Sequence, residues 1–170
     1  MALKILLHRS SYQHSEYVEL VKEAVHYAVD FFNLHDYNWR LEIYLVNSVD
    51  SKNSNSDIMG QHHYIRKANG KEYSQIYISC AGRYKISIVH TIFHELTHLK
   101  QILKKEVTYS KDYAVWKSQT LINEPKSMTD YYNQPHEKDA RRYANILFVK
   151  YTMQKIKQYV KQLLGIKTVL

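Results

Sequence analysis

Three long segments of the chain carry apolar residues at helical spacing. They run from Ser15 to Leu34, from about Ser87 to Leu103, and from Pro135 towards Leu164, where Gly165 marks a suitable end. The apolar stripe of the second segment consists of Ile88, Ile92, Leu96, Leu99 and Leu103. This spacing predicts three helices, of which the last is the longest.

The region between the first two predicted helices has the patterns of strands. Residues Trp39–Val46 alternate between apolar and polar side chains, as a half-buried strand does. Tyr64–Arg66 and Gln75–Ser79 flank the dipeptide Asn69-Gly70, which is typical of a hairpin turn. We therefore expect a strand and then a β-hairpin before the second helix.

Other parts of the chain carry weaker signals. Leu3–Leu7 is a short apolar run that fits either a buried strand or a lead-in segment, and the polar stretch Asn47–Asp57 predicts a loop. Val107–Asn133 has no helical period, and it contains candidate strands around Tyr113–Trp116 and a loop through Asn123–Pro125. This order of elements predicts an α+β fold with a small mixed sheet, built as a single domain of residues 1–170.

The composition is that of an ordinary globular chain, with 45% hydrophobic and 24% charged residues. The single cysteine, Cys80, excludes an internal disulfide framework and a cysteine-rich zinc ribbon, and we expect it to be a small buried apolar residue. No apolar run approaches the roughly 18 residues that a membrane-spanning helix needs, and the first residues lack a secretory signal. We therefore expect a soluble, cytoplasmic protein with no membrane partner.

The net charge of +8 is concentrated near the C-terminus. Residues 140–170 contain seven basic residues and no acidic residue, so the rest of the chain carries only about +1. The seven are Arg141, Arg142, Lys150, Lys155, Lys157, Lys161 and Lys167. They predict either a solvated face of the last helix or a surface for an anionic partner, nucleic acid or an acidic protein, although no nucleic-acid-binding motif accompanies them.

The second predicted helix contains His94-Glu95-Leu96-Thr97-His98, an H-E-x-x-H motif. Residues four apart lie on one face of a helix, so both imidazoles can bind one metal ion. Glu95 is then placed to act as a general base on a metal-activated water. The motif predicts one zinc ion per chain.

A catalytic zinc ion needs a third protein ligand, and the candidates downstream are His136, Glu137 and Asp139. We prefer Glu137, because Pro135 opens the last helix and places Glu137 in its first turn. His136 is the alternative ligand. Asp139 lies two residues from Glu137 and therefore on another face, from which it could orient a ligating histidine.

This pattern resembles the small zincin-like metallopeptidases of phage and bacterial genomes, which are of the glutamate-zincin type. The resemblance extends from about Tyr64 to Ala144. Beyond the H-E-x-x-H motif it rests on Leu99, Gln101, Trp116-Lys117, Tyr132 and Pro135-x-Glu137-x-x-Ala140. The separation between His98 and Glu137 is longer than in compact glutamate-zincins, which keeps His136 as the alternative third ligand.

The resemblance implies a zincin-like metallopeptidase domain in which Glu137 is the third zinc ligand. It also implies a protein or peptide substrate and a location in the cytoplasm of a bacterium or a phage-infected host. In zincins a strand just before the active-site helix lies antiparallel to the bound substrate, and Gln75–Ser79 occupies that place in the sequence.

Several further residues are candidates for supporting roles. Tyr131, Tyr132, His136 and Tyr143 could each stabilise an oxyanion. His62 and His63 could form a second metal site, but adjacent residues of a strand point to opposite sides, so we expect exposed polar histidines.

These observations favour a zinc-dependent metallopeptidase with Glu95 as general base. The first alternative is a non-catalytic zinc protein that binds nucleic acid or an acidic partner through its basic C-terminal helix. An intact Glu95 disfavours it, because a structural zinc site needs no acid at that position. The second alternative is a DNA-associated protease similar to the SprT-like group, whose third ligand is a histidine, which only His136 could supply.

Overall fold

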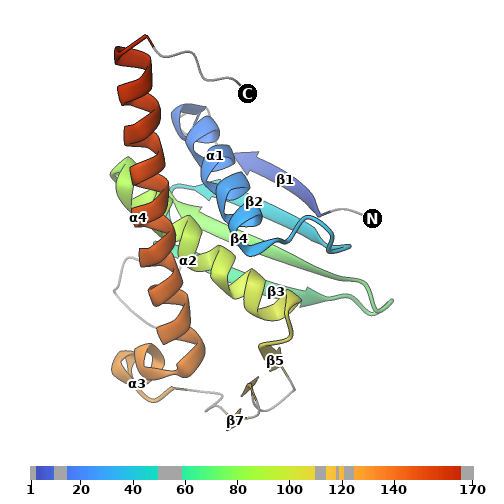
Figure 1. Ribbon diagram of the computed structural model, residues 1–170. Coiled ribbons are helices and arrows are strands. Elements are labelled where there is room, and N and C mark those ends of the chain that lie inside the picture. The colour runs from blue at the N-terminus through green and yellow to red at the C-terminus, as the bar shows by residue number, and fades with distance from the viewer. Residues whose placement is uncertain are drawn as a thin grey trace.

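The computed structural model describes residues 3–9, 15–49, 59–109, 114–117, 119–120 and 125–165. Within them a four-stranded mixed sheet carries two helices on one face, and a long C-terminal helix lies across those helices (Figure 1). The chain is therefore a mixed α/β protein with a small mixed sheet and a long C-terminal helix, as the sequence predicts.

The main sheet has the strand order β1-β2-β4-β3. Strands β1 (Lys4–Arg9), β2 (Arg40–Val46) and β4 (Glu72–Ser79) run parallel, while β3 (Gly60–Arg66) is antiparallel to β4. The inner face of the sheet is apolar and buried, and it includes Leu41, Ile43, Leu45, Ile76 and Ile78. The apolar run Leu3–Leu7 enters strand β1 at Lys4. The predicted hairpin is confirmed, with longer strands than the sequence indicated.

The helices follow the predicted segments closely. Helix α1 (Ser15–Phe32) connects β1 to β2, and α2 (Lys85–Leu103) follows β4. Both bury their apolar stripes in one core cluster with the inner face of the sheet. Helix α4 (Pro135–Leu163) begins with proline in its first turn and packs against α2.

Residues 107–133 connect α2 to α4 through two small structures. A three-stranded antiparallel sheet consists of β5 (Val107–Tyr109), β6 (Ala114–Trp116) and β7 (Gln119–Thr120). Helix α3 (Met128–Asn133) follows, and the Ser127 hydroxyl accepts a hydrogen bond from the backbone N–H of Asp130 at its start. The sequence analysis missed α3, because six residues are too few to establish a helical period.

The position of β4 corrects the predicted substrate strand. Gln75–Ser79 lies inside the sheet, where β4 pairs with β2 on one side and β3 on the other. The backbone N–H and C=O groups on both sides of β4 are therefore paired with neighbouring strands, so β4 cannot pair with a substrate chain. The edge strand beside α2 is β3.

Three expectations concern parts of the chain outside the described residues. These are most of the predicted loop 47–57, residue 113 of the candidate strand, and residues 123 and 124. Cys80 is buried, as expected. Among the described helices, none is long and apolar enough to cross a membrane.

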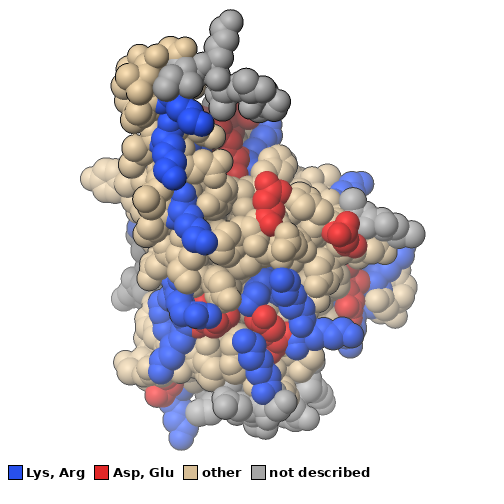
Figure 2. Space-filling model, in the orientation of Figure 1, with Lys and Arg blue, Asp and Glu red and all other residues tan. Residues whose placement is uncertain are grey.

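The basic side chains of α4 do not form one continuous patch. Figure 2 shows Lys and Arg along α4 interrupted by uncharged residues, with acidic residues beside several of them. Arg142 pairs with Asp139 at 3.0 Å, Lys155 pairs with Glu23 at 2.7 Å, and the Lys150 ammonium lies 4.9 Å from the ring centre of Phe31. This arrangement is typical of a solvated helix face with local ion pairs.

Candidate metal centre

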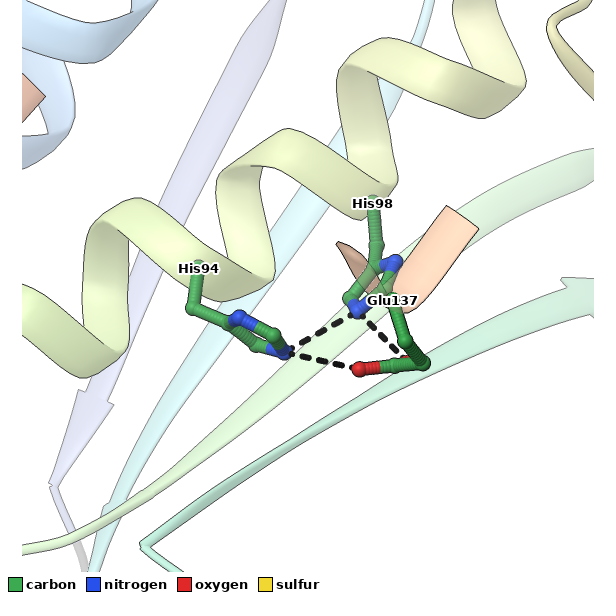
Figure 3. Close-up of side chains that lie close together, drawn as sticks. All are labelled: His94, His98 and Glu137. Atoms are coloured by element: carbon green, nitrogen blue, oxygen red, sulfur yellow. Dashed lines mark hydrogen bonds and ion pairs between the residues drawn. The ribbon is translucent and has the colours of Figure 1, made fainter. Parts of the chain in front are cut away.

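Helix α2 brings the two histidines of the motif together. His94 and His98 are one turn apart, and their Nε2 atoms lie 3.2 Å from each other. Both imidazoles point away from the helix axis towards the start of α4 (Figure 3). The H-E-x-x-H motif therefore has the geometry that the sequence predicts.

The first turn of α4 adds Glu137 to this pair. Its Oε1 atom lies 3.1 Å from His98 Nε2, and its Oε2 atom lies 3.4 Å from His94 Nε2. One donor atom from each of the three residues lies within 4.8 Å of the others. Two histidines of α2 and a glutamate 39 residues after the second of them thus form one cluster, which we call the metal cluster.

The spacing of the metal cluster can be compared with that of ligands around a tetrahedral metal ion. Ligand bonds of about 2.0–2.1 Å at tetrahedral angles place ligand atoms roughly 3.3 Å apart. The two imidazole nitrogens are 3.2 Å apart, which is close to that value, and the two oxygens of Glu137 each approach a different imidazole, at 3.1 and 3.4 Å. Glu137 Oε2 is shielded from solvent, and its partners within the described residues are the longer ion-pair contacts with His94 at 3.4 Å and Arg141 at 3.9 Å, which leaves it able to bind a cation. The residues present can therefore hold a divalent metal ion.

The electrostatics of the metal cluster keep Glu137 ionised. Burial alone would raise the pKa of this carboxyl, but hydrogen bonding to His94 and His98 outweighs that effect and holds the pKa well below its usual range. Burial disfavours the charged form of His98, while Glu137 favours it, and the net pKa is raised. Glu137 and His98 therefore each favour the charged form of the other.

The cluster is open on the side of His94. The side chain of His94 is 20% exposed, whereas that of Glu137 is 2% exposed. A catalytic zinc site keeps one coordination position for water or substrate, while a structural site is closed. Partial exposure of one ligand provides the access that such a position needs.

Glu95, the predicted general base, is buried beside this cluster. Burial raises the pKa of its carboxyl, and the negative charge of Glu137 adds to that effect while His94 and His98 oppose it. The carboxyl lies against Gly60 at the start of β3. The approach is so close that a methyl group added at Gly60 would lie 2.9 Å from Glu95 Oε1. Gly60 therefore makes room for Glu95, a role the sequence analysis did not assign.

Gln101 contacts the ring nitrogen of His98 that faces away from the metal cluster. It accepts a hydrogen bond from His98 Nδ1 at 3.0 Å and donates to the backbone oxygen of His136 at 2.9 Å and to Asp139 Oδ2 at 3.2 Å. A neutral His98 that donates through Nδ1 presents the Nε2 lone pair to the metal cluster. Asp139 was predicted to orient a histidine directly, but in the contacts of the described residues Gln101 stands between Asp139 and His98.

The tyrosine candidates occupy different surroundings. The Tyr131 hydroxyl donates to Glu137 Oε1 at 2.7 Å, so its contact is with the third ligand. Tyr132 is 48% exposed, and its ring lies beside Arg141. The ring of Tyr143 packs against Phe32, the Lys100 ammonium and the Arg142 guanidinium, and none of these three residues belongs to the metal cluster. Of these candidates, only Tyr131 contacts a cluster residue in the interactions described.

Two further histidines lie beside the metal cluster. The ring centre of His98 lies 6.3 Å from that of His62 and 5.8 Å from that of His136. Burial lowers the pKa of His62 to about 3 and that of His136 to about 4. His62 Nε2 and His136 Nδ1 are shielded and form no hydrogen bond within the described residues.

The expectation of exposed histidines on β3 is therefore wrong, since His62 and His63 are both half-buried. The ring of His62 points to the helix side of the sheet, where α2 covers it. His63 points to the opposite face and packs edge-on against Tyr77, with 5.4 Å between ring centres. The predicted alternation is thus confirmed, and His62 is a neighbour of the metal cluster that sequence reasoning missed.

No protein-family model matches this chain, and neither a curated protein nor a solved structure matches it. What the chain does is therefore argued from the geometry and chemistry of the metal cluster.

Proposed function

We propose that this protein is a zinc-dependent metallopeptidase of zincin type. The observation that carries the proposal is the convergence of His94, His98 and Glu137, which bring one donor atom each within 4.8 Å of the others, with the carboxyl of Glu95 buried alongside. Two imidazoles and one carboxylate form a ligand set of catalytic zinc sites. A bound zinc ion would lower the pKa of a water molecule towards about 7 and polarise a substrate carbonyl.

The residues of the chain then divide the work of hydrolysis. Glu95 accepts a proton from the attacking water while the oxygen of that water bonds to the carbonyl carbon of the substrate. The same carboxyl delivers that proton to the amide nitrogen when the C–N bond breaks. A raised pKa suits this role, because it brings the carboxyl closer to the pH at which it must both accept and release a proton.

The substrate chain would lie along the outer edge of β3. This strand ends the order β1-β2-β4-β3, begins with Gly60 against Glu95, and contains His62 beside His98. An extended peptide can add to an exposed strand edge through backbone hydrogen bonds. A peptide bound there would pass the metal cluster.

The alternatives receive less support. A non-catalytic zinc protein does not explain a buried carboxyl with a raised pKa beside the ligands. A SprT-like site would take its third ligand from a histidine, whereas Glu137 is the residue whose oxygens lie 3.1 and 3.4 Å from the two imidazoles.

The test is the substitution Glu95→Gln, compared with His94→Ala. Glutamine cannot accept the proton from water, so Glu95→Gln should keep one zinc per chain and lose cleavage of a casein-type substrate by about 10²–10⁴-fold or more. His94→Ala should lose both zinc and activity. Metal analysis and a peptidase assay on the same preparations measure the two effects separately. A Glu95→Gln protein as active as the parent, or a parent protein that binds zinc but cleaves no substrate in a broad peptide library, would contradict the proposal.

A further inference from the structure

The C-terminal half of α4 carries a row of exposed apolar side chains. They are between 44% and 67% exposed, and their spacing of four, three, four and three residues places them on one side of the helix. The row consists of Val149, Met153, Ile156, Val160 and Leu163, and we call it the outer stripe. Such a run of exposed apolar residues marks an interaction surface.

The outer stripe is separate from the side of α4 that packs on the body of the protein. That inner side consists of the buried residues Ala140, Ala144, Leu147 and Tyr151. Val149 is two residues after Leu147, which corresponds to about 200° around the helix. At the next inner positions, 154 and 158, the chain has glutamine, so the inner side becomes polar where the outer stripe continues.

Near the start of the outer stripe, α4 is anchored to α1 through Glu23. The Tyr151 hydroxyl donates to Glu23 at 3.2 Å, and Lys155 forms an ion pair with the same carboxylate. Beyond this point α4 extends past α1 and α2 (Figure 1). The helix therefore presents its apolar side in a preformed shape, which reduces the entropy lost on binding.

The alternation of four and three residues is the heptad pattern of a coiled coil. Met153 and Val160 occupy the a positions, and Val149, Ile156 and Leu163 occupy the d positions. Such a seam requires a second helix with the same repeat. A second copy of this chain supplies that repeat by symmetry.

The residues that flank the seam favour a parallel pair. One flank carries Lys150 and Lys157, and the other carries Asn145 and Thr152 at the corresponding positions. In a parallel pair each lysine faces a neutral residue of the other helix. In an antiparallel pair the lysine flanks would face each other, and like charges would repel.

We infer that the protein forms a parallel homodimer through a short coiled coil of its outer stripes. The twofold axis then runs along α4, and the two bodies lie on opposite sides of the helix pair. Glu137 precedes Val149 by 12 residues, about 18 Å along the helix. Both metal clusters therefore lie at the same end of the dimer and outside the seam.

Sedimentation velocity of the full chain from about 1 to 100 μM, a range that covers moderate dimer affinities, tests this inference. The parent should be a dimer. Ile156→Glu with Val160→Glu places charges in the seam and should weaken the dimer about 100-fold or more. Gln154→Glu with Gln158→Glu is the matched control, since it adds the same two charges four residues apart on the other side, and should leave the dimer intact. Circular dichroism checks that each variant is folded.

Cross-linking tests the orientation independently of the charged variants. In a parallel pair Leu163 lies opposite Leu163 of the second copy. In an antiparallel pair a d position faces an a position, so Leu163 lies opposite a residue such as Met153, about 15 Å along the seam from the other Leu163. Leu163→Cys should therefore form a disulfide-linked dimer on mild oxidation, and Gln158→Cys should not. A parent that is monomeric throughout the range, including one that binds a DNA duplex or anionic vesicles instead, would overturn the inference. So would a dimer that tolerates Ile156→Glu with Val160→Glu, or a Leu163→Cys protein that fails to cross-link.

Discussion

At the scale of single residues, neighbouring side chains at the start of α4 have different parts in the metal cluster. Glu137 directs both carboxylate oxygens at His94 and His98, while His136 Nε2 lies 3.7 Å from Glu137 Oε1 and contributes no atom to the three-residue cluster. Consecutive helical residues differ by about 100° in direction, so only one of the two can face the cluster fully.

Glu137→Ala should therefore abolish stoichiometric zinc binding, and His136→Ala should leave the zinc content near that of the parent. The reason is that only the first substitution removes the carboxylate whose two oxygens approach His98 at 3.1 Å and His94 at 3.4 Å. Metal analysis after dialysis measures both variants. The reverse result, with zinc lost by His136→Ala and kept by Glu137→Ala, would assign the third ligand to histidine.

Gln101 is a second residue whose effect can be measured without any activity assay. Gln101→Met keeps the volume of this 1% exposed side chain but removes its hydrogen bonds to His98, His136 and Asp139. The loss of an outer partner of a ligating histidine should weaken zinc binding about 10–100-fold. Competition titration with a chromophoric chelator measures the change. Equal affinity in the variant and the parent would show that Gln101 does not orient His98.

At the scale of elements, the close approach of β3 and α2 sets the position of the general base. A methyl group at Gly60 would lie 2.4 Å from Thr91 Cγ2 and 2.9 Å from Glu95 Oε1. Both distances are shorter than the contacts that Cβ atoms make in folded proteins, so the strand or the two side chains would have to move. The absence of a side chain at Gly60 is thus what lets β3 lie directly against Glu95.

Gly60→Ala should lower the free energy of unfolding by about 1–3 kcal/mol through overpacking. Thr91→Ser removes the Cγ2 atom and keeps the hydroxyl that donates to the Ser87 backbone oxygen. The combination Gly60→Ala with Thr91→Ser should therefore recover part of the loss. Denaturant unfolding of the single and double variants measures the free energy of unfolding of each protein. A double variant less stable than the sum of the two single changes would contradict this explanation.

At the scale of the whole molecule, the metal cluster joins two helices that are distant in the chain. His98 in α2 and Glu137 in α4 are separated by 39 residues, and the intervening segment contains the small sheet and α3. An ion bound by both helices would stabilise only the folded state, since the unfolded chain does not keep these ligands together.

Zinc should therefore raise the melting temperature of the protein. At a free concentration 100 times the Kd, one site contributes about 2.7 kcal/mol, which corresponds to roughly 5–10 °C for a chain of this size. Calorimetry with zinc and with excess chelator measures the shift. His94→Ala is the control and should show little shift. Equal melting temperatures of the parent in zinc and in chelator would contradict a shared site.

The sequence by itself determined the features that depend on local spacing. The three long helices, the hairpin around Asn69-Gly70 and the shared face of His94 and His98 all follow from periodicity within one segment. Helix α3 is also local, and its signal is Ser127 followed by Asp130, but one short turn has too few positions to form an apolar stripe.

Only the tertiary structure decided which separate segments meet. The pairing of β2 with β4 makes β4 internal and leaves β3 at the edge, and no local pattern specifies the order of strands. The same holds for Gln101 between His98 and Asp139, and for His62 beside the metal cluster. These contacts depend on how the elements pack in three dimensions, because a sequence pattern records the direction of a side chain on its own element and not the residue that it meets.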